Sequence, residues 1–283
     1  MRVLFCRKSA VDYYFLKMEE FLHFLQGEME KPGVFSWFHF VALFLILAVS
    51  ILVPWFTRNA SEKTYKRILL GFWIVLIVLE VGKQILLSFH YGSPSYWEYS
   101  YRDFPFSVCS MVYYFAPIIL FVSKDKHPKI VDAAVGYLCF ITLVGGLLVC
   151  AYSDMVTSRL IYINIQTFVH HGCMLVLGVM IYVWKRKTIT IKTYYRSMIA
   201  FLLTVIIAIA INLAFQPHFI NMFFINPMII TNLPVGNIIQ EKAGYPVYLL
   251  CFLAAMSLAA FLAYLVETSI GKAVERKKTK KGE

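Results

Sequence analysis

Residues 167–184 read Thr-Phe-Val-His-His-Gly-Cys-Met-Leu-Val-Leu-Gly-Val-Met-Ile-Tyr-Val-Trp, an apolar segment interrupted by two adjacent histidines. A run of this composition fits the roughly 20 apolar residues that cross a bilayer as a helix. Imidazole is costly in hydrocarbon, so within a span it usually faces the protein interior or a watery cavity. The segment therefore predicts a membrane protein, and it makes His170 and His171 functional candidates.

The composition of the whole chain is that of a polytopic membrane protein. Of its 283 residues, 60% are hydrophobic and only 15% are charged, which excludes an ordinary soluble domain. We predict an all-α membrane helix bundle with seven transmembrane helices, inserted as a multi-pass protein of the cell membrane. The predicted spans are Val34–Phe56, Ile68–Phe89, Phe104–Val122, Ile130–Ala151, Ile163–Trp184, Met198–Phe215 and Pro246–Val266.

Positive charges alternate along the predicted loops. The loops after spans one, three, five and seven are rich in Lys and Arg, whereas the other three hold Arg102, Arg159 and Lys242 respectively. Cytoplasmic loops carry the excess of Lys and Arg in membrane proteins. The alternation predicts an external N-terminus and a cytoplasmic C-terminus, and it agrees with seven spans.

The chain divides into three predicted segments. Residues 1–33 hold an amphipathic interfacial helix, because apolar side chains from Val11 to Leu25 recur at helical spacing; an ordinary helix packed on the bundle is the alternative. Residues 34–270 form the transmembrane domain, and residues 271–283 form a basic cytoplasmic tail. We expect the net charge of +11 to reflect this topology. The expected partner of the tail is the anionic lipid headgroup, and nucleic acid is not expected.

Polar side chains from four predicted spans fall at one depth, in the outer half of the bundle, while the inner halves of the same spans are nearly free of them. These residues are Glu80, Lys83, Gln84, Cys109, His170, His171, Asn212, Gln216 and, in the following loop, Asn221. Their shared depth predicts a polar cavity that opens toward the outer leaflet. The alternative is that each group satisfies a neighbour locally.

Cys109 is the most reactive candidate of this set. Pro105 predicts a helix start, which puts Cys109 about one turn inside the helix, where the helix dipole alone would not activate a thiol. A nearby imidazole of His170 or His171 could take the thiol proton and generate a thiolate nucleophile. Glu80, Asn212 or a backbone carbonyl could then orient the imidazole.

Structural roles are the alternatives for the same residues. Cys109 alone is well suited to packing, and membrane histidines often bond between helices. Glu80 and Lys83 suit a structural ion pair. The Gly145-Gly146 pair predicts close contact between helices. No metal site or cofactor is expected, because the adjacent His170 and His171 diverge on a helix and are poorly spaced for one ion.

Several short motifs are similar to those of a known family. They are Asp103-Phe-Pro-Phe-Ser-Val-Cys-Ser110, similar to the family's Leu-Pro-Leu-His-Leu-Cys segment, His171-Gly172, Ile211-Asn212, the stretch Asn221 to Pro234, and Gly244-Tyr-Pro-Val-Tyr248, with Glu80 in keeping. On these residues, in order over most of its length, the chain resembles the YwaF-type bacterial integral membrane protein family. That family in turn resembles an animal ether-phospholipid cysteine acyltransferase (transmembrane protein 164-like). Ser107 departs from the pattern, because the family has a histidine there.

The resemblance implies Cys109 as the nucleophile and His171 as the base, with His170 as the alternative base. Because acyl-CoA is cytoplasmic and the predicted cavity opens outward, we expect a membrane phospholipid as acyl donor and a lysophospholipid or similar molecule as acceptor. The predicted function is therefore an integral membrane acyltransferase (a lipid transacylase), and water as acceptor would make it a lipase. The alternative is a non-enzymatic transporter or a lipid- or ligand-binding membrane protein with the same polar cavity.

Overall fold

The computed structural model describes residues 10–281, so residues 1–9 of the predicted N-terminal segment and the last two residues of the predicted tail lie outside it. Among the described residues, six helices are long and apolar enough to cross a membrane. They are α2 (Trp37–Thr57), α3 (Glu62–Ser88), the continuous helix Pro128–Ala151, α7 (Ile161–Lys185), α8 (Ile191–Ala214) and residues 245–273 of α10 (Tyr245–Lys281). The predicted all-α, multi-pass membrane bundle is confirmed.

The third predicted span, Phe104–Val122, differs from the expectation of seven full spans. The helix there is shorter, Cys109–Phe121, and consists of a 3-10 turn (Cys109–Met111) followed by α4 (Val112–Phe121). At about 1.5 Å per residue it is about 20 Å long, less than the roughly 30 Å hydrocarbon layer. It begins late because the Ser107 hydroxyl accepts the backbone N–H of Ser110 at 3.2 Å, which ends the preceding loop four residues beyond Pro105.

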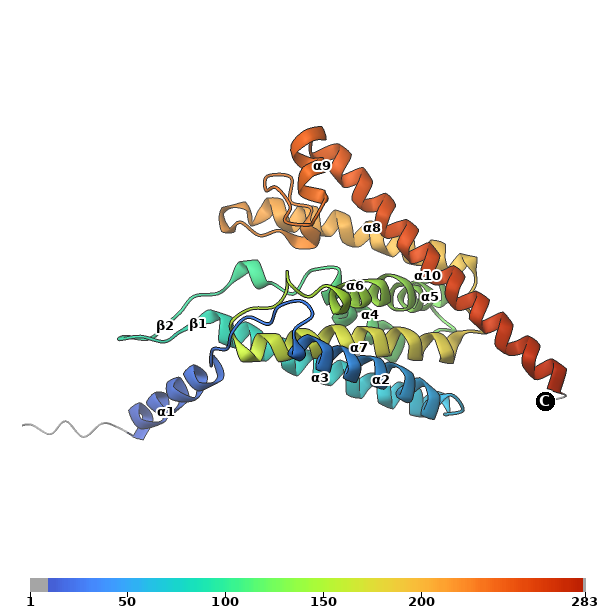
Figure 1. Ribbon diagram of the computed structural model, residues 1–283, viewed down its shortest axis with the longest axis horizontal. Helices are drawn as coiled ribbons and strands as arrows, with labels where there is room; N and C mark the ends of the chain where they lie inside the picture. The colour runs from blue at the N-terminus through green and yellow to red at the C-terminus, as the bar shows by residue number, and fades with distance from the viewer. Residues whose placement is uncertain (1–9, 282–283) are drawn as a thin grey trace, which may run out of the picture.

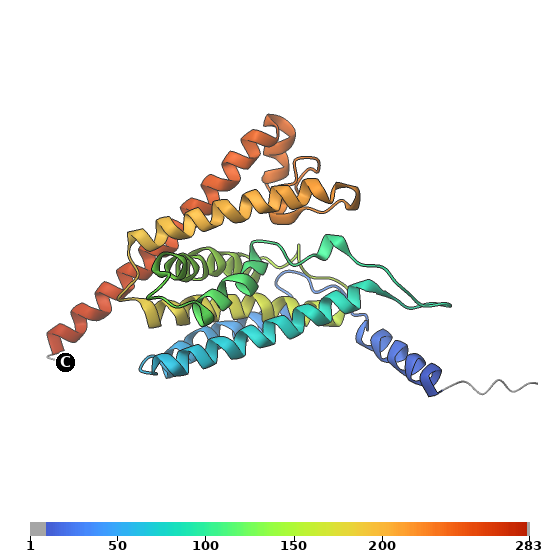
Figure 2. The same ribbon diagram turned by 180° about the vertical axis from the view of Figure 1, so that it is seen from behind.

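The helices form three layers (Figure 1), and α7 packs against α2, α3 and the Pro128–Ala151 helix. One layer holds α2, α3 and α7; the middle layer holds α4 and the Pro128–Ala151 helix; the third holds α8 and α10, and the view from behind shows the same order (Figure 2). In the most apolar 18-residue stretch of α7, 78% of the residues are buried. The corresponding share is 11% in both α2 and α10. The outer helices therefore present their apolar side chains to lipid, and α7 carries the core.

Glycines on α7 and on its neighbour allow this close packing. A Cβ on Gly146 would lie 2.9 Å from the His171 carbonyl oxygen, and one on Gly172 would lie 2.7 Å from Ile46 of α2. Such distances leave no space for a side chain. The predicted close helix contact at Gly146 is confirmed, and it fixes the backbone of the histidine pair against α6.

The remaining elements are short or peripheral. The Pro128–Ala151 helix comprises α5 (Pro128–Gly136), a π-helical segment (Tyr137–Thr142) and α6 (Leu143–Ala151). The others are α1 (Ala10–Leu25), the antiparallel strands β1 (Phe89–His90) and β2 (Tyr96–Trp97), α9 (Gly236–Ala243), and 3-10 turns at Tyr101–Asp103, Gln216–His218 and Met222–Phe224. α10 continues as one helix to Lys281, so the described part of the predicted tail is helical.

One end of the bundle carries α1 and the β1–β2 hairpin, which project from the helical layers (Figure 1). The aromatic side chains of α1 are largely exposed, and Phe24 is 77% exposed, while Leu22 is buried against Leu86 and Phe89. α3 ends and α7 begins at this same end of the bundle. Polar residues near the end of α3 and in the first half of α7 therefore come together there.

Candidate functional site

A cavity of about 450 Å³ lies between α3, the loop that leads into α4, and the first half of α7. Polar side chains dominate the wall near α3 and α7, and Phe224 closes it from the loop after α8. Its polar lining residues are Glu80, Lys83, Arg102, Asp103, Ser107, Cys109, Ser110, Thr157, Ser158, Gln166, Thr167, His170 and His171. The cavity wall thus includes a thiol, two imidazoles and two carboxylates inside an otherwise apolar bundle.

His170 belongs to a chain of hydrogen bonds that crosses three helices. Its Nδ1 lies 2.7 Å from the Tyr113 hydroxyl, and Tyr113 donates to Glu80 Oε2 at 3.0 Å. Lys83 Nζ lies 2.8 Å from the other oxygen of Glu80, Oε1. His170 Nε2 lies 3.2 Å from the carbonyl oxygen of Cys109. The chain therefore fastens α3, α4 and α7 together beside the cavity.

The hydrogen-bond pattern limits where protons can lie along this chain. The Cys109 carbonyl can only accept, so His170 Nε2 carries a proton. When Tyr113 donates to Glu80, its oxygen accepts a second N–H from His170, and the ring is positive opposite a carboxylate. Moving each proton one place gives a neutral His170 and a protonated Glu80 with the same heavy-atom geometry. A neutral His170 that accepts from Tyr113, with Glu80 ionised beside Lys83, fits the same heavy atoms, so the chain offers a path along which a proton can move between Glu80 and His170.

His171 has a different environment from its neighbour. Its Nδ1 lies 2.7 Å from the Thr167 carbonyl oxygen, one turn earlier on α7. Because a carbonyl only accepts, Nδ1 carries the proton of the neutral ring and Nε2 carries the lone pair. His171 lines the cavity, and the described residues provide no hydrogen-bond partner for Nε2. A backbone carbonyl thus selects the tautomer in which Nε2 can accept a proton.

Cys109 is the first residue of its helix rather than a residue one turn inside it, because the helix begins four residues after Pro105. The positive end of a helix dipole favours negative charge within the first turn. A Cβ on Gly145 would lie 3.8 Å from the Cys109 sulfur, so α6 closes one side of the thiol without covering it. The thiol is a free cysteine, half-buried in the cavity wall.

The structure brings together only part of the predicted polar set. Cys109, His170, His171, Glu80 and Lys83 line the cavity, and Gln84 lies behind it, donating to Glu80 Oε1 at 2.7 Å and to the Asp103 carbonyl at 2.6 Å. Among the residues that the structure describes, those that line the cavity do not include Asn212, Gln216 or Asn221. The prediction that polar residues from four spans converge on one cavity is therefore corrected. The predicted residues that line the cavity come from three elements: α3, the helix that begins at Cys109, and α7.

Asn212, near the end of α8, and Asn221, in the following loop, hold that loop in place instead. Fully buried Asn212 bonds to both the N–H and the carbonyl of Met222, at 2.7 and 3.0 Å. Asn221 accepts the N–H of Asn226 at 2.9 Å, and Gln216 is exposed. The loop between them places Phe224 on the cavity wall. These amides support the wall from behind.

Hydropathy did not indicate two residues of the candidate site: Tyr113, which bonds to Glu80 and lies 2.7 Å from His170, and Thr167, which lines the cavity. Each lies four positions from a candidate residue, Tyr113 after Cys109 and Thr167 before His171, which on a helix means the same face. That spacing was the signal available in the sequence. Over the described residues no group of three or more His, Cys, Asp or Glu side chains has a geometry that could hold a metal ion.

Comparison with known families gives one match. The sequence profile of the TMEM164 family matches residues 34–264, which is most of the chain and includes every residue that lines the cavity. The chain therefore belongs to the TMEM164 family. No curated protein and no solved structure matches it.

Proposed function

We propose that this member of the TMEM164 family is a lipid transacylase that uses Cys109 as nucleophile and His171 as general base. The geometry of His171 supports this proposal most directly. The Thr167 carbonyl holds the Nδ1 proton, so the lone pair is on Nε2 in a ring that shares one cavity with the Cys109 thiol. Nucleophilic catalysis by cysteine needs such a base within reach.

The first half of the reaction transfers an acyl group to the protein. His171 Nε2 takes the thiol proton, and the Cys109 sulfur attacks the ester carbonyl of a phospholipid. The carbon–oxygen bond to the glycerol breaks, and the departing alkoxide receives the proton from His171. The products are an acyl-thioester and a lysophospholipid. No oxidant, reductant or metal is required.

The second half regenerates the thiol. A hydroxyl group of a lysophospholipid acceptor gives its proton to His171 and attacks the thioester carbonyl. The carbon–sulfur bond breaks, and the proton returns to the Cys109 sulfur. Water in place of the lipid acceptor gives net hydrolysis. The Lys83 ammonium and the first-turn backbone amides of the Cys109 helix are the positive groups that we propose stabilise the oxyanion in both steps.

His170 has a supporting role in this proposal. Both of its ring nitrogens are engaged, one by Tyr113 and the other by the Cys109 carbonyl. It therefore positions the backbone of the nucleophile, while a proton that moves along the Glu80 chain balances charge in the low-dielectric interior. This division is the reason that we propose His171 rather than His170 as the base.

The proposal includes an orientation. We propose that the Cys109–Phe121 helix completes seven passes, with the N-terminus outside, because Lys and Arg alternate along the loops. The cavity then lies toward the outer leaflet, where phospholipid is available and acyl-CoA is not. Assignment to the YwaF-type bacterial branch of such proteins belongs to this proposal too, and it rests on the segment Asp103 to Ser110.

Anionic lipid headgroups are the partners that we propose on the opposite side. At that end of α7, Arg186, Lys187 and Lys272 line a cavity of about 270 Å³ next to the basic end of α10. Juxtamembrane Lys and Arg attract anionic lipid by about 1 kcal/mol each.

An alkyne-tagged, thiol-reactive lipid tests the chemistry. Purified wild type is compared with Cys109→Ser, His171→Ala and the matched control Cys173→Ser, since Cys173 is a buried cysteine outside the cavity. We expect labelling of the Cys109 peptide in wild type and control, none in Cys109→Ser, and strongly slowed labelling in His171→Ala. Equal labelling of all four proteins would contradict the proposal.

A non-enzymatic transporter is the second candidate, because a proton that can move between Glu80 and His170 also suits proton-coupled movement of a ligand. The two functions separate in sealed vesicles. A transacylase forms a new lipid from unlabelled phospholipid and lysophospholipid without a pH gradient. A proton-coupled transporter forms none, and its substrate uptake requires the gradient.

A further inference from the structure

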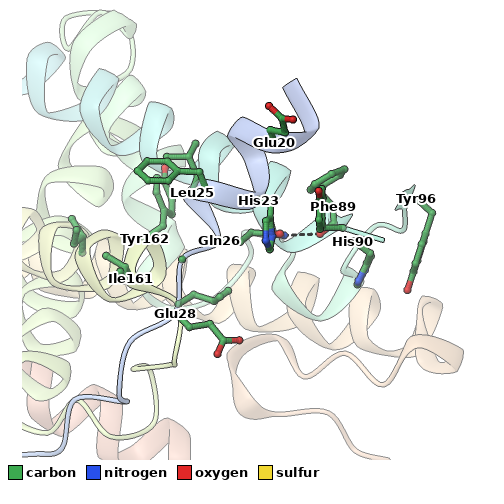
Figure 3. A pocket seen from close by; sticks show the side chains of 15 residues that line it. Glu20, His23, Leu25, Gln26, Glu28, Phe89, His90, Tyr96, Ile161 and Tyr162 are labelled. Atoms are coloured by element: carbon green, nitrogen blue, oxygen red, sulfur yellow. Dashed lines mark hydrogen bonds between the residues drawn. The ribbon is translucent and has the colours of Figure 1, made fainter. Parts of the chain in front are cut away.

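A second and larger cavity, of about 1040 Å³, lies at the end of the bundle that carries α1 (Figure 3). Its wall comes from three separate segments: the end of α1 with residues 26–28, the β1–β2 hairpin, and the start of α7. Apolar and aromatic side chains make up most of it, among them Phe24, Leu25, Phe89, Ile161 and Ile165. It is therefore a groove suited to an apolar ligand rather than a polar one.

Hydrogen bonds hold these three segments in place. Gln26 Nε2 donates to the carbonyl of Phe89 at 2.6 Å (Figure 3) and to the carbonyl of Leu86 at 2.7 Å, which joins the residue after α1 to the end of α3. Residues 27–29 pair with residues 159–161: the Ile161 N–H donates to the Gly27 carbonyl at 3.0 Å, and the Met29 N–H donates to the Arg159 carbonyl at 2.7 Å. The groove is thus a built feature of the fold.

Leu160 is the residue that connects the groove to the candidate site. It lines both the groove and the cavity that contains Cys109 and His171. Its side chain is half-buried and its backbone lies in the short pairing with Glu28. Leu160 is therefore the residue that the two linings have in common.

Several apolar side chains that line the groove are exposed on the protein surface. Phe24 is 77% exposed, Ile165 is 49% exposed and Ile161 is 41% exposed, all beside the opening. Tyr91 and Tyr96 are half-exposed on the hairpin side, as expected of aromatic residues at a membrane–water interface. An acyl chain can therefore enter from the lipid while its headgroup stays at the interface.

We propose that this groove is the binding site for the acyl chain of a membrane phospholipid and the portal through which the chain reaches Cys109, with Leu160 as the gate. The portal's use in catalysis rests on the proposed transacylase function, but binding in the groove does not. Continuity through Leu160 favours a lipid over a peptide or a second copy of the chain, because only a narrow flexible chain can pass one side chain and occupy both spaces.

Two maleimides test the gate without requiring catalysis. One carries a long alkyl chain, delivered in vesicles of zwitterionic phospholipid, and the other is small and water-soluble. Modification of the Cys109 peptide is quantified by mass spectrometry in full-length protein, in Leu160→Trp, and in the control Leu203→Trp, which alters an exposed lipid-facing residue of α8. We expect Leu160→Trp to slow the long-chain reagent about tenfold or more, with the small reagent and the control unchanged.

Equal slowing of both reagents, or slowing of neither, would overturn the gate. Occupancy is measured separately by a phospholipid with a photoreactive acyl chain, used on Cys109→Ser protein. We expect crosslinks to the peptide that contains Tyr162 and Ile165, and their absence would overturn the binding site. If these crosslinks and the gate effect are seen but no acyl transfer occurs, the transacylase proposal fails and the portal stands.

Discussion

Two groups of polar residues are predicted to share one cavity, but only the group around Cys109 and His171 lines it, while the group around Asn212 lies outside its lining. At His171, a hydrogen bond engages one nitrogen of the imidazole, and the ring lines the same cavity as the Cys109 thiol. Around Asn212, every amide contact goes to backbone of the loop after α8. The first group lines the cavity with groups that we propose react, and the second holds the shape of the chain.

The backbone explains why the second group is needed. Phe223 and Phe224 have φ angles of 58° and 61°, a left-handed conformation that is rarely adopted outside glycine. Bonds from Asn212 to Met222 and from Asn226 to the Ile220 carbonyl at 2.6 Å keep the loop in this conformation. A buried polar residue thus indicates function only when its hydrogen bonds leave part of it unused.

Replacement of the proposed base gives the largest expected difference between the two groups. His171→Ala should slow acyl-thioester formation by about 10²–10⁴-fold, because general base catalysis contributes that much. Asn212→Ala should slow it by less than about tenfold, through displacement of the Phe224 wall alone. Single-turnover acylation measured by intact-protein mass spectrometry checks both variants. Similar slowing in the two would remove the distinction between them.

Stability should show the reverse order. Asn212→Leu leaves the buried N–H of Met222 without its partner, at a cost of about 1–3 kcal/mol, and the Met222 carbonyl keeps only the Ile225 N–H at 3.3 Å. His171→Leu, at the cavity wall, removes one hydrogen bond to the Thr167 carbonyl. It therefore disturbs fewer backbone hydrogen bonds than Asn212→Leu does. We therefore expect a lower thermal unfolding midpoint for Asn212→Leu than for His171→Leu, measured in the same detergent. A larger loss in His171→Leu would show that the histidine is structural.

Hydropathy could predict the membrane bundle because long apolar runs have few alternatives in a bilayer. It could not predict the short Cys109–Phe121 helix, since its start depends on one hydroxyl, Ser107, bonding to the Ser110 backbone. Depth along the spans correctly grouped Glu80, His170 and Cys109 at one cavity. The position of Asn221 outside the cavity could not be predicted, because a loop residue has no helical periodicity from which to place it.

The separation of Asn212 from the cavity could not be predicted for a related reason. Depth gives a residue's level in the membrane but not the direction in which its side chain points around the helix axis. That direction depends on the path of residues 215–226, which turns through non-glycine left-handed positions with no sequence signal. Helical spacing, by contrast, does carry direction, and it would have identified Tyr113 from Cys109.

Tyr113→Phe is expected to have an intermediate effect, because it cuts the hydrogen-bond chain without touching the thiol or His171. His170 Nδ1 and Glu80 Oε2 each lose a partner, so the protein should lose about 1–3 kcal/mol of stability. Acylation should slow by about tenfold through poorer positioning of the Cys109 carbonyl. Tyr114→Phe, at an exposed neighbouring tyrosine, is the matched control. If Tyr113→Phe matches that control in both measurements, the chain has no positioning role.

Gln216→Ala should have the smallest effect and tests the outer limit of the candidate site. Sequence depth grouped Gln216 with the polar cavity, but its side chain is exposed in the Gln216–His218 turn and does not line it. Surface substitutions away from buried contacts change stability by about 0.5 kcal/mol or less. We expect the thermal midpoint and the acylation rate to equal those of wild type within error. A tenfold slower acylation at an unchanged midpoint would mean that lipid bound at the cavity extends over this turn, and the site would then include the surface after α8.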